Sequence, residues 1–250
     1  MNTIGNCRIH LESVTSTNDV AWQYATDDQF NGLVVIADEQ HSGRGTRGRR
    51  WHAERGTALL CSTLIKLDEQ LCRPVVLTIW AGVSVCKVID HWSQVKPVLK
   101  WPNDVLINQK KLCGILVEIR NPWCVIGIGI NVHKPMHHYH EKGISNSTFL
   151  NEHTKRMIEV EEVTDSIISS LNEGYAKLLQ NDQHQDLLAG WENYSGLLGR
   201  HVEAVTTQGV ITGKVKSLHW NGIVLNDQSG LRTILPESIL KMNQEGQVDV

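Results

Sequence analysis

Apolar and polar positions in the first half of the chain follow strand patterns, with one helical stretch among them. Short apolar, β-branched runs predict strands at 7–11, 32–38, 58–67, 97–99, 105–108, 112–119 and 123–132. From Arg73 to Trp92 apolar residues recur at helical spacing, and Pro74 stands where a helix begins. Tight turns join the later strands, so we expect an α+β fold: a mixed, largely antiparallel sheet with packed helices.

The pattern changes in the second half of the chain. A polar, His-rich stretch at 133–151 predicts an exposed loop, and amphipathic helices are expected at 163–178 and 186–194. Short β runs separated by Gly-containing turns then follow at 200–207, 210–218, 222–225 and 231–235. They predict a small all-β barrel, and we expect two domains, 1–195 and 196–250.

Composition narrows the class of protein. The chain has 24 Lys and Arg against 27 Asp and Glu, a net charge of -3, which disfavours general binding of nucleic acid. Six cysteines lie singly in apolar runs, with no C-x-x-C pair and no apolar N-terminal signal segment. The longest apolar run, 75–85, is too short to span a bilayer. We therefore expect a soluble, cytoplasmic protein with reduced thiols.

Residues 43–51, here named the arginine loop, concentrate positive charge. Four arginines alternate with three glycines there, an arrangement in which guanidinium groups and backbone amides converge on an anion. A solvated basic loop is the alternative. The spacing Gly43-x-Gly45-x-x-Gly48 is that of a dinucleotide-binding turn, but a strand follows it where that fold needs a helix. Walker and protein-kinase motifs are missing as well.

A second group of polar residues runs from Lys100 to Asp104, with Lys111 across a short hairpin. Such lysines can screen the charge of a phosphoryl or acyl-phosphate centre, while Asp104, with Glu118, could hold Mg²⁺ or steer an incoming amine. Taken singly, Lys111 has an alternative as a hairpin lysine and Asp104 as a turn former.

Two further features have plain structural alternatives. The hydroxyl and amide side chains of 13–19 precede a helical segment, where helix capping alone would explain them, although a helix start also suits a polar ligand. His137, His138 and His140 could hold a metal, but no second ligand cluster accompanies them. No metal ligands are therefore assigned.

Four ordered motifs resemble those of the biotin-protein ligases. They are Gly43-Arg44-Gly45-x-Arg47-Gly48-Arg49-x-Trp51, Lys100-Trp101-Pro102-Asn103-Asp104, Lys111-x-x-Gly114-Ile115-Leu116-Val117-Glu118 and Gly127-x-Gly129-Ile130-Asn131. Ser16-Thr17-Asn18 and the C-terminal β segment extend the resemblance over nearly the whole chain, in the form without an N-terminal DNA-binding domain. It implies a fold like that of the class II synthetases with an SH3-like C-terminal barrel.

The resemblance also implies an activity. Such ligases activate biotin with ATP as biotinyl-5'-AMP and transfer the biotinyl group to a lysine of a carrier, usually the biotin carboxyl carrier protein of acetyl-CoA carboxylase. ATP and biotin are then substrates, Mg²⁺ is the cofactor, and the protein is a monomer or homodimer without membrane or operator binding. A lipoate-protein ligase and a biotin sensor without catalysis are the alternatives.

The resemblance assigns roles residue by residue. It implies catalytic roles for Lys111, Arg44 and Asp104, with Lys111 at the reacting carboxylate and Asp104 guiding the acceptor lysine. Biotin would contact Ser16, Thr17, Asn18, Gln40, Gly43, Arg44, Gly45, Thr46, Lys111 and Gly114. The nucleotide would contact Arg47, Arg49, Trp51, Lys100, Asn103 and Asn131. Thr46 departs from the family, which most often has arginine there, and the change removes one charge from the arginine loop.

Overall fold

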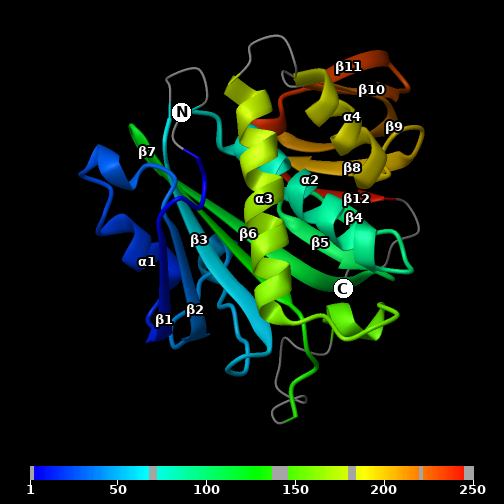
Figure 1. Cartoon of the computed structure of the whole chain (residues 1–250). Coiled ribbons are helices and arrows are strands. Elements are labelled where there is room, and N and C mark those ends of the chain that lie inside the picture. The colour runs from blue at the N-terminus through cyan, green and yellow to red at the C-terminus, as the bar shows by residue number, and fades with distance from the viewer. Residues whose placement is uncertain (1–2, 68–71, 137–145, 180–183, 220–221, 245–250) are drawn as a thin grey trace.

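The larger of two sheets has seven strands in the order β1-β2-β3-β7-β6-β5-β4 (Figure 1). The computed structural model describes residues 3–67, 72–136, 146–179, 184–219 and 222–244. β1 pairs with β2 in parallel, and every other pair in this sheet is antiparallel, as expected. The strands are β1 (Arg8–Val14), β2 (Val34–Gln40), β3 (Ala58–Lys66), β4 (Val98–Lys100), β5 (Asp104–Ile107), β6 (Lys110–Arg120) and β7 (Trp123–Asn131).

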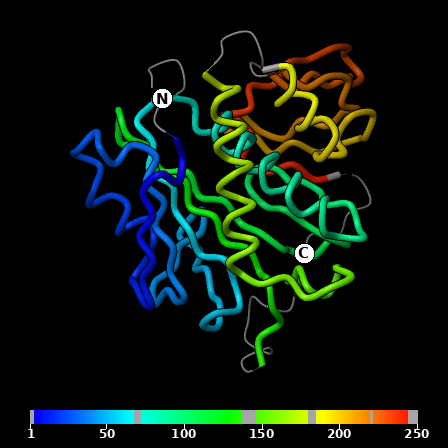
Figure 2. The backbone as a smooth tube through the Cα atoms, in the orientation of Figure 1, coloured from blue at the N-terminus to red at the C-terminus, as the bar shows by residue number. Residues whose placement is uncertain are grey.

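Helices cover both faces of this sheet. Alternate side chains of a strand point to opposite faces, so Val34 packs in the cluster with α2 and α3, whereas Val35 packs beside α1. Figure 2 shows α3 crossing in front of the sheet. The helices are α1 (Thr17–Trp22), α2 (Pro74–Trp92), α3 (Val160–Leu179) and α4 (His184–Ser195). The predicted helices are confirmed, although α1 begins at Thr17, inside the segment 13–19 that was expected to precede it.

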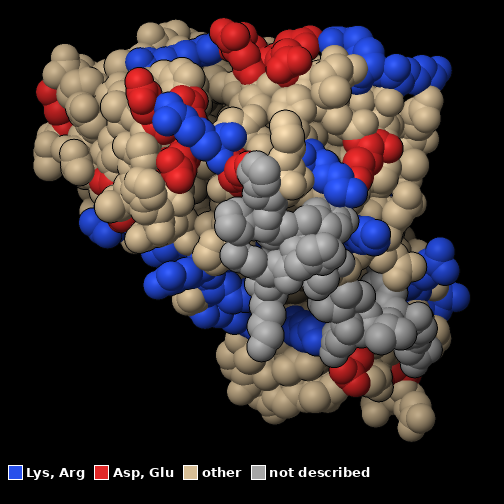
Figure 3. Space-filling view, turned by 90° about the horizontal axis from the view of Figure 1, so that it is seen from below, with Lys and Arg blue, Asp and Glu red and all other residues tan. Residues whose placement is uncertain are grey.

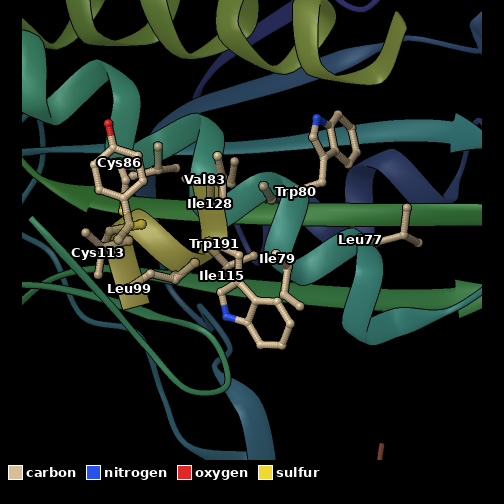
Figure 4. Close-up of a cluster of buried hydrophobic side chains, with 14 of the residues drawn as sticks. Leu77, Ile79, Trp80, Val83, Cys86, Leu99, Cys113, Ile115, Ile128 and Trp191 are labelled. Carbon is tan, nitrogen blue, oxygen red and sulfur yellow. The ribbon is translucent and has the colours of Figure 1, made fainter. Parts of the chain in front are cut away.

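The core lies between α2 and the sheet. Figure 4 shows Val83 and Ile79 of α2 beside Ile115 of β6 and Ile128 of β7, with Trp191 of α4 closing the cluster. By length and composition alone the whole of α2, which contains the apolar run 75–85, would be long enough to cross a membrane. Its burial explains its composition, because 67% of the apolar window is already buried inside the protein.

The second sheet has five strands in the order β11-β10-β9-β8-β12, all antiparallel. They are β8 (His201–Thr206), β9 (Gly209–His219), β10 (Gly222–Asp227), β11 (Gly230–Ile234) and β12 (Ile239–Gln244). The predicted closed barrel is wrong, because among the described residues no pairing joins β11 to β12. Pro236 lies between these two strands in a short 3-10 turn, and β12 continues on the opposite edge of the sheet.

Residues 237–240 attach the second sheet to the first. Glu237 pairs with Arg73 at 2.6 Å, and the Ile239 carbonyl accepts a hydrogen bond from Trp101 Nε1 at 3.2 Å. The Leu240 carbonyl accepts a further bond from Arg47 Nη2 in the arginine loop. One short segment thus contacts the start of α2, the turn before β5 and the arginine loop. The predicted division into domains at residue 196 stays a prediction.

The polar stretch at 133–151 is described only in part. Its last residues include a 3-10 turn, Leu150–Glu152, and not an uninterrupted loop. The hypothetical metal ligands His137, His138 and His140 lie outside the described residues.

Candidate functional site

A cavity of about 750 Å³ opens on the sheet face opposite α2. Its floor is the backbone of β6 and β7 at Gly114, Gly127 and Gly129, where missing side chains leave the space. Fifteen of the seventeen residues assigned to the site line it: Ser16, Thr17, Asn18, Gln40, Arg44, Gly45, Thr46, Arg49, Trp51, Lys100, Asn103, Asp104, Lys111, Gly114 and Asn131. Gly43 and Arg47 do not line it.

The arginine loop folds back on itself as a narrow hairpin. Gly45 N donates to Arg49 O at 2.7 Å, and Trp51 N donates to Gly43 O at 2.9 Å. A Cβ atom at Gly43 would lie 2.7 Å from the Trp51 carbonyl, so glycine is needed there to close the hairpin. Gly43 therefore shapes the loop although it does not line the cavity.

Arg44 is held by two carboxylates. Its Nη1 and Nη2 each donate to Asp19 at 2.7 Å, and Nη2 lies 3.5 Å from Glu118 Oε1. The hydrogen bonds to Asp19 are the main cause that raises the pKa of Arg44 above its ordinary value, against partial desolvation. The guanidinium is thus fixed at the cavity wall as a bidentate ion pair.

Arg47 and Arg49 take different directions. Arg47 adopts a left-handed backbone with φ of 59° at the tip of the hairpin, and its guanidinium reaches the Leu240 carbonyl. Arg49 donates to the hydroxyl of Thr46 at 3.3 Å and remains at the cavity. In this arrangement Arg49, and not Arg47, is placed to meet an anion in the cavity.

Lys111 lies beside Asp104 on the opposite wall. Lys111 Nζ is 2.7 Å from Asp104 Oδ1 and 5.5 Å from the centroid of the Trp51 ring. An ammonium group over an aromatic face is favoured by the ring quadrupole. Main-chain bonds at 2.9 Å to Asn146 O and from Thr148 N fix the backbone of Lys111. The charge of Lys111 is therefore held at a defined point of the cavity.

Trp51 covers the glycine floor. A Cβ atom at Gly129 would lie 2.5 Å from Trp51 Cε2, and one at Gly114 would lie 3.0 Å from Cζ3. The indole is therefore in contact with the strand backbone. Its Nε1 is buried without a hydrogen-bond partner among the described residues, as is Oδ1 of Asn103. Unpaired buried polar atoms beside a cavity are positions where a ligand can complete the hydrogen bonds.

The two asparagines assigned to the nucleotide also stabilise the protein. Asn131 Nδ2 lies 3.4 Å from Lys111 O and 3.3 Å from Thr148 O, so it ties β7 to the chain around the lysine. Asn103 Nδ2 donates to Ile115 O at 2.9 Å. In each residue the amide nitrogen thus donates to main-chain carbonyl groups, while the residue also lines the cavity.

Polar groups lie at the far end of the cavity, where Ser16, Thr17, Asn18 and Gln40 line it and Ser62 lies behind them. Gln40 Oε1 accepts from Thr17 N at 2.8 Å, and Ser62 Oγ lies 2.7 Å from Thr17 Oγ1 and 2.6 Å from Asn18 Oδ1. Ser16 is buried at the N-cap position of α1 without capping it, so capping alone does not explain this segment. Ser62 was not predicted; the available signal was two polar residues, 62 and 63, inside a buried strand.

The carboxylates proposed for Mg²⁺ do not fit a shared ion. Asp104 pairs across from Gly114, and Glu118 is four residues further along β6, roughly 13 Å away at strand spacing. Each carboxylate already contacts a cation, Lys111 or Arg44. In the described part of the chain no group of three or more His, Cys, Asp and Glu side chains could hold a metal.

Charges of both signs are mixed on the lower face of the molecule. Figure 3 shows groups of Lys and Arg next to groups of Asp and Glu on this face. The described residues visible on this face therefore do not form the single basic stripe that is typical of a general nucleic-acid-binding protein.

The α+β fold and the cavity define a protein that binds a small, partly apolar ligand together with anionic groups, since cations and glycine backbone line the same space. Residues 10–132 match the model of the Biotin/lipoate A/B protein ligase family. The chain is 29% identical to the bifunctional ligase/repressor BirA of Bacillus spizizenii over 242 residues, which cover 94% of this chain and 74% of that protein.

Two further comparisons extend the match. The chain is 37% identical to the biotin--[acetyl-CoA-carboxylase] ligase of Mycobacterium tuberculosis over 122 residues, 47% of this chain and 46% of that protein. Its fold matches biotin protein ligase from Aquifex aeolicus, solved in complex with biotin and ATP, with a TM-score of 0.81 and 26% identity over 96% of this chain and 100% of that one. The chain thus carries a domain that matches the Biotin/lipoate A/B protein ligase family, and it is similar to biotin protein ligases over nearly its whole length.

Proposed function

We propose that this protein is an ATP-dependent biotin ligase. It joins the biotin carboxylate to the α-phosphate of ATP as biotinyl-5'-AMP with release of pyrophosphate, and then transfers the biotinyl group to a lysine of a carrier protein. The observation that carries the proposal is the lining of one cavity by Arg44, Arg49 and Lys111 together with buried amides and hydroxyls. Similarity to biotin protein ligases supports the same activity.

The chemistry follows from the charges. A carboxylate and a polyphosphate repel one another, and Lys111 and Arg49 reduce that repulsion where the two anions meet. Trp51 covers the cavity floor and offers an aromatic face to a nucleotide base. The hydroxyls and amides at the other end suit the ureido group of biotin, which has two N–H donors and one carbonyl acceptor.

Asp104 serves first as the partner of Lys111. When Lys111 moves toward the acyl phosphate, the carboxylate becomes available to the amine of the incoming carrier lysine. Attack of that amine on the acyl carbon breaks the anhydride bond and releases AMP. The carrier itself is proposed from the chemistry of the product, with the biotin carboxyl carrier protein of acetyl-CoA carboxylase as the first candidate.

Mg²⁺ belongs to the proposal only as an ion that arrives with ATP, since the protein carboxylates do not fit a shared site. We also propose 1–195 as the catalytic domain and a cytoplasmic location, which six cysteines lying singly in apolar runs support.

The direct test is incubation of the protein with ATP, Mg²⁺, biotin and a purified carrier domain, followed by mass measurement of the carrier. A mass increase of one biotinyl group is expected, and its absence at saturating substrates would contradict the proposal. Replacement of biotin by lipoate separates the lipoate ligase alternative. A biotin sensor would bind biotin without releasing pyrophosphate.

A further inference from the structure

The segment 146–148 lies beside the start of β6 and is absent from the residues assigned to the site. It forms a short parallel bridge with β6, in which Ser147 pairs with Lys111. Lys111 N donates to Asn146 O, and Thr148 N donates to Lys111 O, both at 2.9 Å. The main-chain N–H and carbonyl of Lys111 are therefore both bonded to this segment.

The regular sheet holds Lys111 less closely than it holds the rest of β6. On the β5 side the register shifts by one residue, because Leu106 pairs with Lys111 whereas Val105 pairs with Cys113. On the β7 side the pairing begins at Cys113. Lys111 thus lies next to a β-bulge, where ladder bonds are disrupted, and past the end of a neighbouring strand. The segment 146–148 takes the place that β7 leaves beside it.

The main chain of Lys111 determines where its ammonium group lies. The end of the side chain lies against β6, since a Cβ atom at Gly114 would be 3.2 Å from both Cε and Nζ of Lys111. Nζ is 2.7 Å from Asp104 Oδ1. A shift of the segment would therefore move the ammonium group relative to the cavity, and reaction rates are sensitive to displacements of about 1 Å.

A buried hydroxyl, that of Thr148, anchors the segment. Thr148 has 3% of its surface exposed and does not line the cavity. Its Oγ1 donates to Glu152 Oε2 at 3.2 Å and lies 2.6 Å from His153 Nε2. The two bonds are compatible when the imidazole N–H donates to the hydroxyl oxygen and the hydroxyl proton goes to the carboxylate. Thr148 is thus tied to the 3-10 turn Leu150–Glu152 and to the residue that follows it.

That turn is itself held by the core. Leu150 is fully buried, and the His153 carbonyl accepts a hydrogen bond at 2.9 Å from Gln94 N, just after α2. Asn131 of β7 adds a second tie, since its Nδ2 lies 3.3 Å from Thr148 O and 3.4 Å from Lys111 O. A continuous path of contacts therefore leads from the packed turn through Thr148 to Lys111.

We propose that Thr148 is a positioning residue for Lys111: its hydroxyl holds the segment 146–148 in the place where the segment fixes the main chain of the lysine. This inference rests on the proposed function, in which Lys111 acts where the carboxylate and the phosphate meet. Thr148 does not line the cavity, so it acts on the reaction through Lys111 and not by contact with a substrate.

Thr148→Val is the informative variant, because valine has the shape of threonine without the hydroxyl. The rate of pyrophosphate release at saturating biotin and ATP should fall about tenfold, the effect of losing one buried hydrogen bond that orients a reacting group. Thr148→Ser keeps the hydroxyl and should restore most of the rate. Thr154→Val is the matched control, because it removes a hydroxyl that contacts Asn151 and the Arg156 carbonyl instead, and it should leave the rate unchanged.

A double-mutant cycle separates positioning from a general loss of stability. In a Lys111→Ala background, Thr148→Val should cause no further fall in pyrophosphate release, because the group that it displaces is gone. A merely structural role would lower the rate by the same factor in both backgrounds. His153→Phe removes the other end of the same anchor, so it should also slow the wild-type background, and it provides the test if the valine variant does not fold.

Three results would overturn the inference while the ligase activity of the wild type stands. They are an equal fall in the Lys111→Ala background, an equal fall in Thr154→Val, and wild-type rates in both Thr148→Val and His153→Phe. A serine variant as slow as the valine variant would overturn the role of the hydroxyl. A wild type that forms no biotinyl-AMP from biotin and ATP would instead overturn the proposed function.

Discussion

At the scale of single residues, charge pairing organises the cavity. Arg44 and Lys111 each lie against a carboxylate, at 2.7 Å from Asp19 and Asp104. Such pairs keep the cations in place without leaving them unpaired. In the reaction proposed above, an anionic substrate would replace these carboxylates as the partner of each cation, so its charge would arrive at groups that are already oriented.

Lys111→Ala should reduce adenylate formation by roughly a hundredfold to a thousandfold, the effect of removing one group that stabilises developing charge. The melting temperature should change little, because a partly exposed ion pair contributes little to stability. Pyrophosphate release measures the loss. Lys110→Ala is the control, since Lys110 is the exposed neighbour on the same strand; equal losses in both variants would argue against the assigned role.

Gly129→Ala should raise the KM for ATP, because its methyl group would overlap the Trp51 ring, which lies 2.5 Å from the Cβ position. Steady-state kinetics with varied ATP check this. In a Trp51→Ala background the same substitution should have little further effect, since the ring that it displaces is gone. Additive effects would show that the two residues do not act on each other.

The partners of most side chains in the arginine loop could not be predicted from the sequence. The run 43–51 indicated an anion site, but the backbone turn at Arg47 that sends its guanidinium to the second sheet depends on local φ and ψ. Ser62 and Asp19 were missed for a related reason: their roles come from neighbours 45 and 25 residues away in sequence, Thr17 and Arg44. The residue types alone predicted an anion-binding site, but which side chains contact one another could be seen only in the folded structure.

At the scale of elements, the sequence predicted almost every strand and helix. Periodicity identifies α2 because it is long and its buried residues recur at helical spacing, whereas β3 is identified as a continuously apolar, buried run. It failed at β12, whose six residues follow a turn that the β pattern did not distinguish from a chain end. Closure of the barrel was likewise inferred from the number of short strands, and strand number alone does not determine whether two edges pair.

One face of the seven-stranded sheet packs against α2 and the other lines the cavity. A substitution in α2 tests whether stability and ligand binding depend on different faces. Leu77 is buried in the core on the face opposite the cavity. Leu77→Ala should lower the free energy of unfolding by about 2–5 kcal/mol, while KM for biotin at a temperature where the variant is folded should be unchanged. Urea unfolding and pyrophosphate release provide the two measurements. A large rise in KM would show that α2 also shapes the cavity.

At the scale of the whole molecule, the buried thiols link stability to alkaline pH. Burial raises the pKa of Cys61 from 9.0 to about 12, and it also raises the pKa values of Cys86, Cys113 and Cys124. The folded state therefore keeps protons that the unfolded state loses. This contribution to stability is complete below about pH 9 and is lost as pH rises toward 12.

Urea unfolding at pH 8 and pH 10 should show a lower midpoint at pH 10, and Cys61→Ala should reduce that difference. Alkylation by iodoacetamide at pH 8, followed by mass measurement, gives an independent check. In the native protein only the half-buried Cys7 and Cys72 should react, whereas all six cysteines should react in denaturant. Rapid modification of Cys61 in the native state would contradict its burial.

The contact between the arginine loop and the second sheet is made to a main-chain oxygen, that of Leu240. A carbonyl accepts the Arg47 proton whichever side chain its residue carries, and the Leu240 side chain is itself 42% exposed. In a saturation library, position 240 should therefore accept nearly every amino acid without loss of the hydrogen bond between Arg47 and the main-chain carbonyl of residue 240.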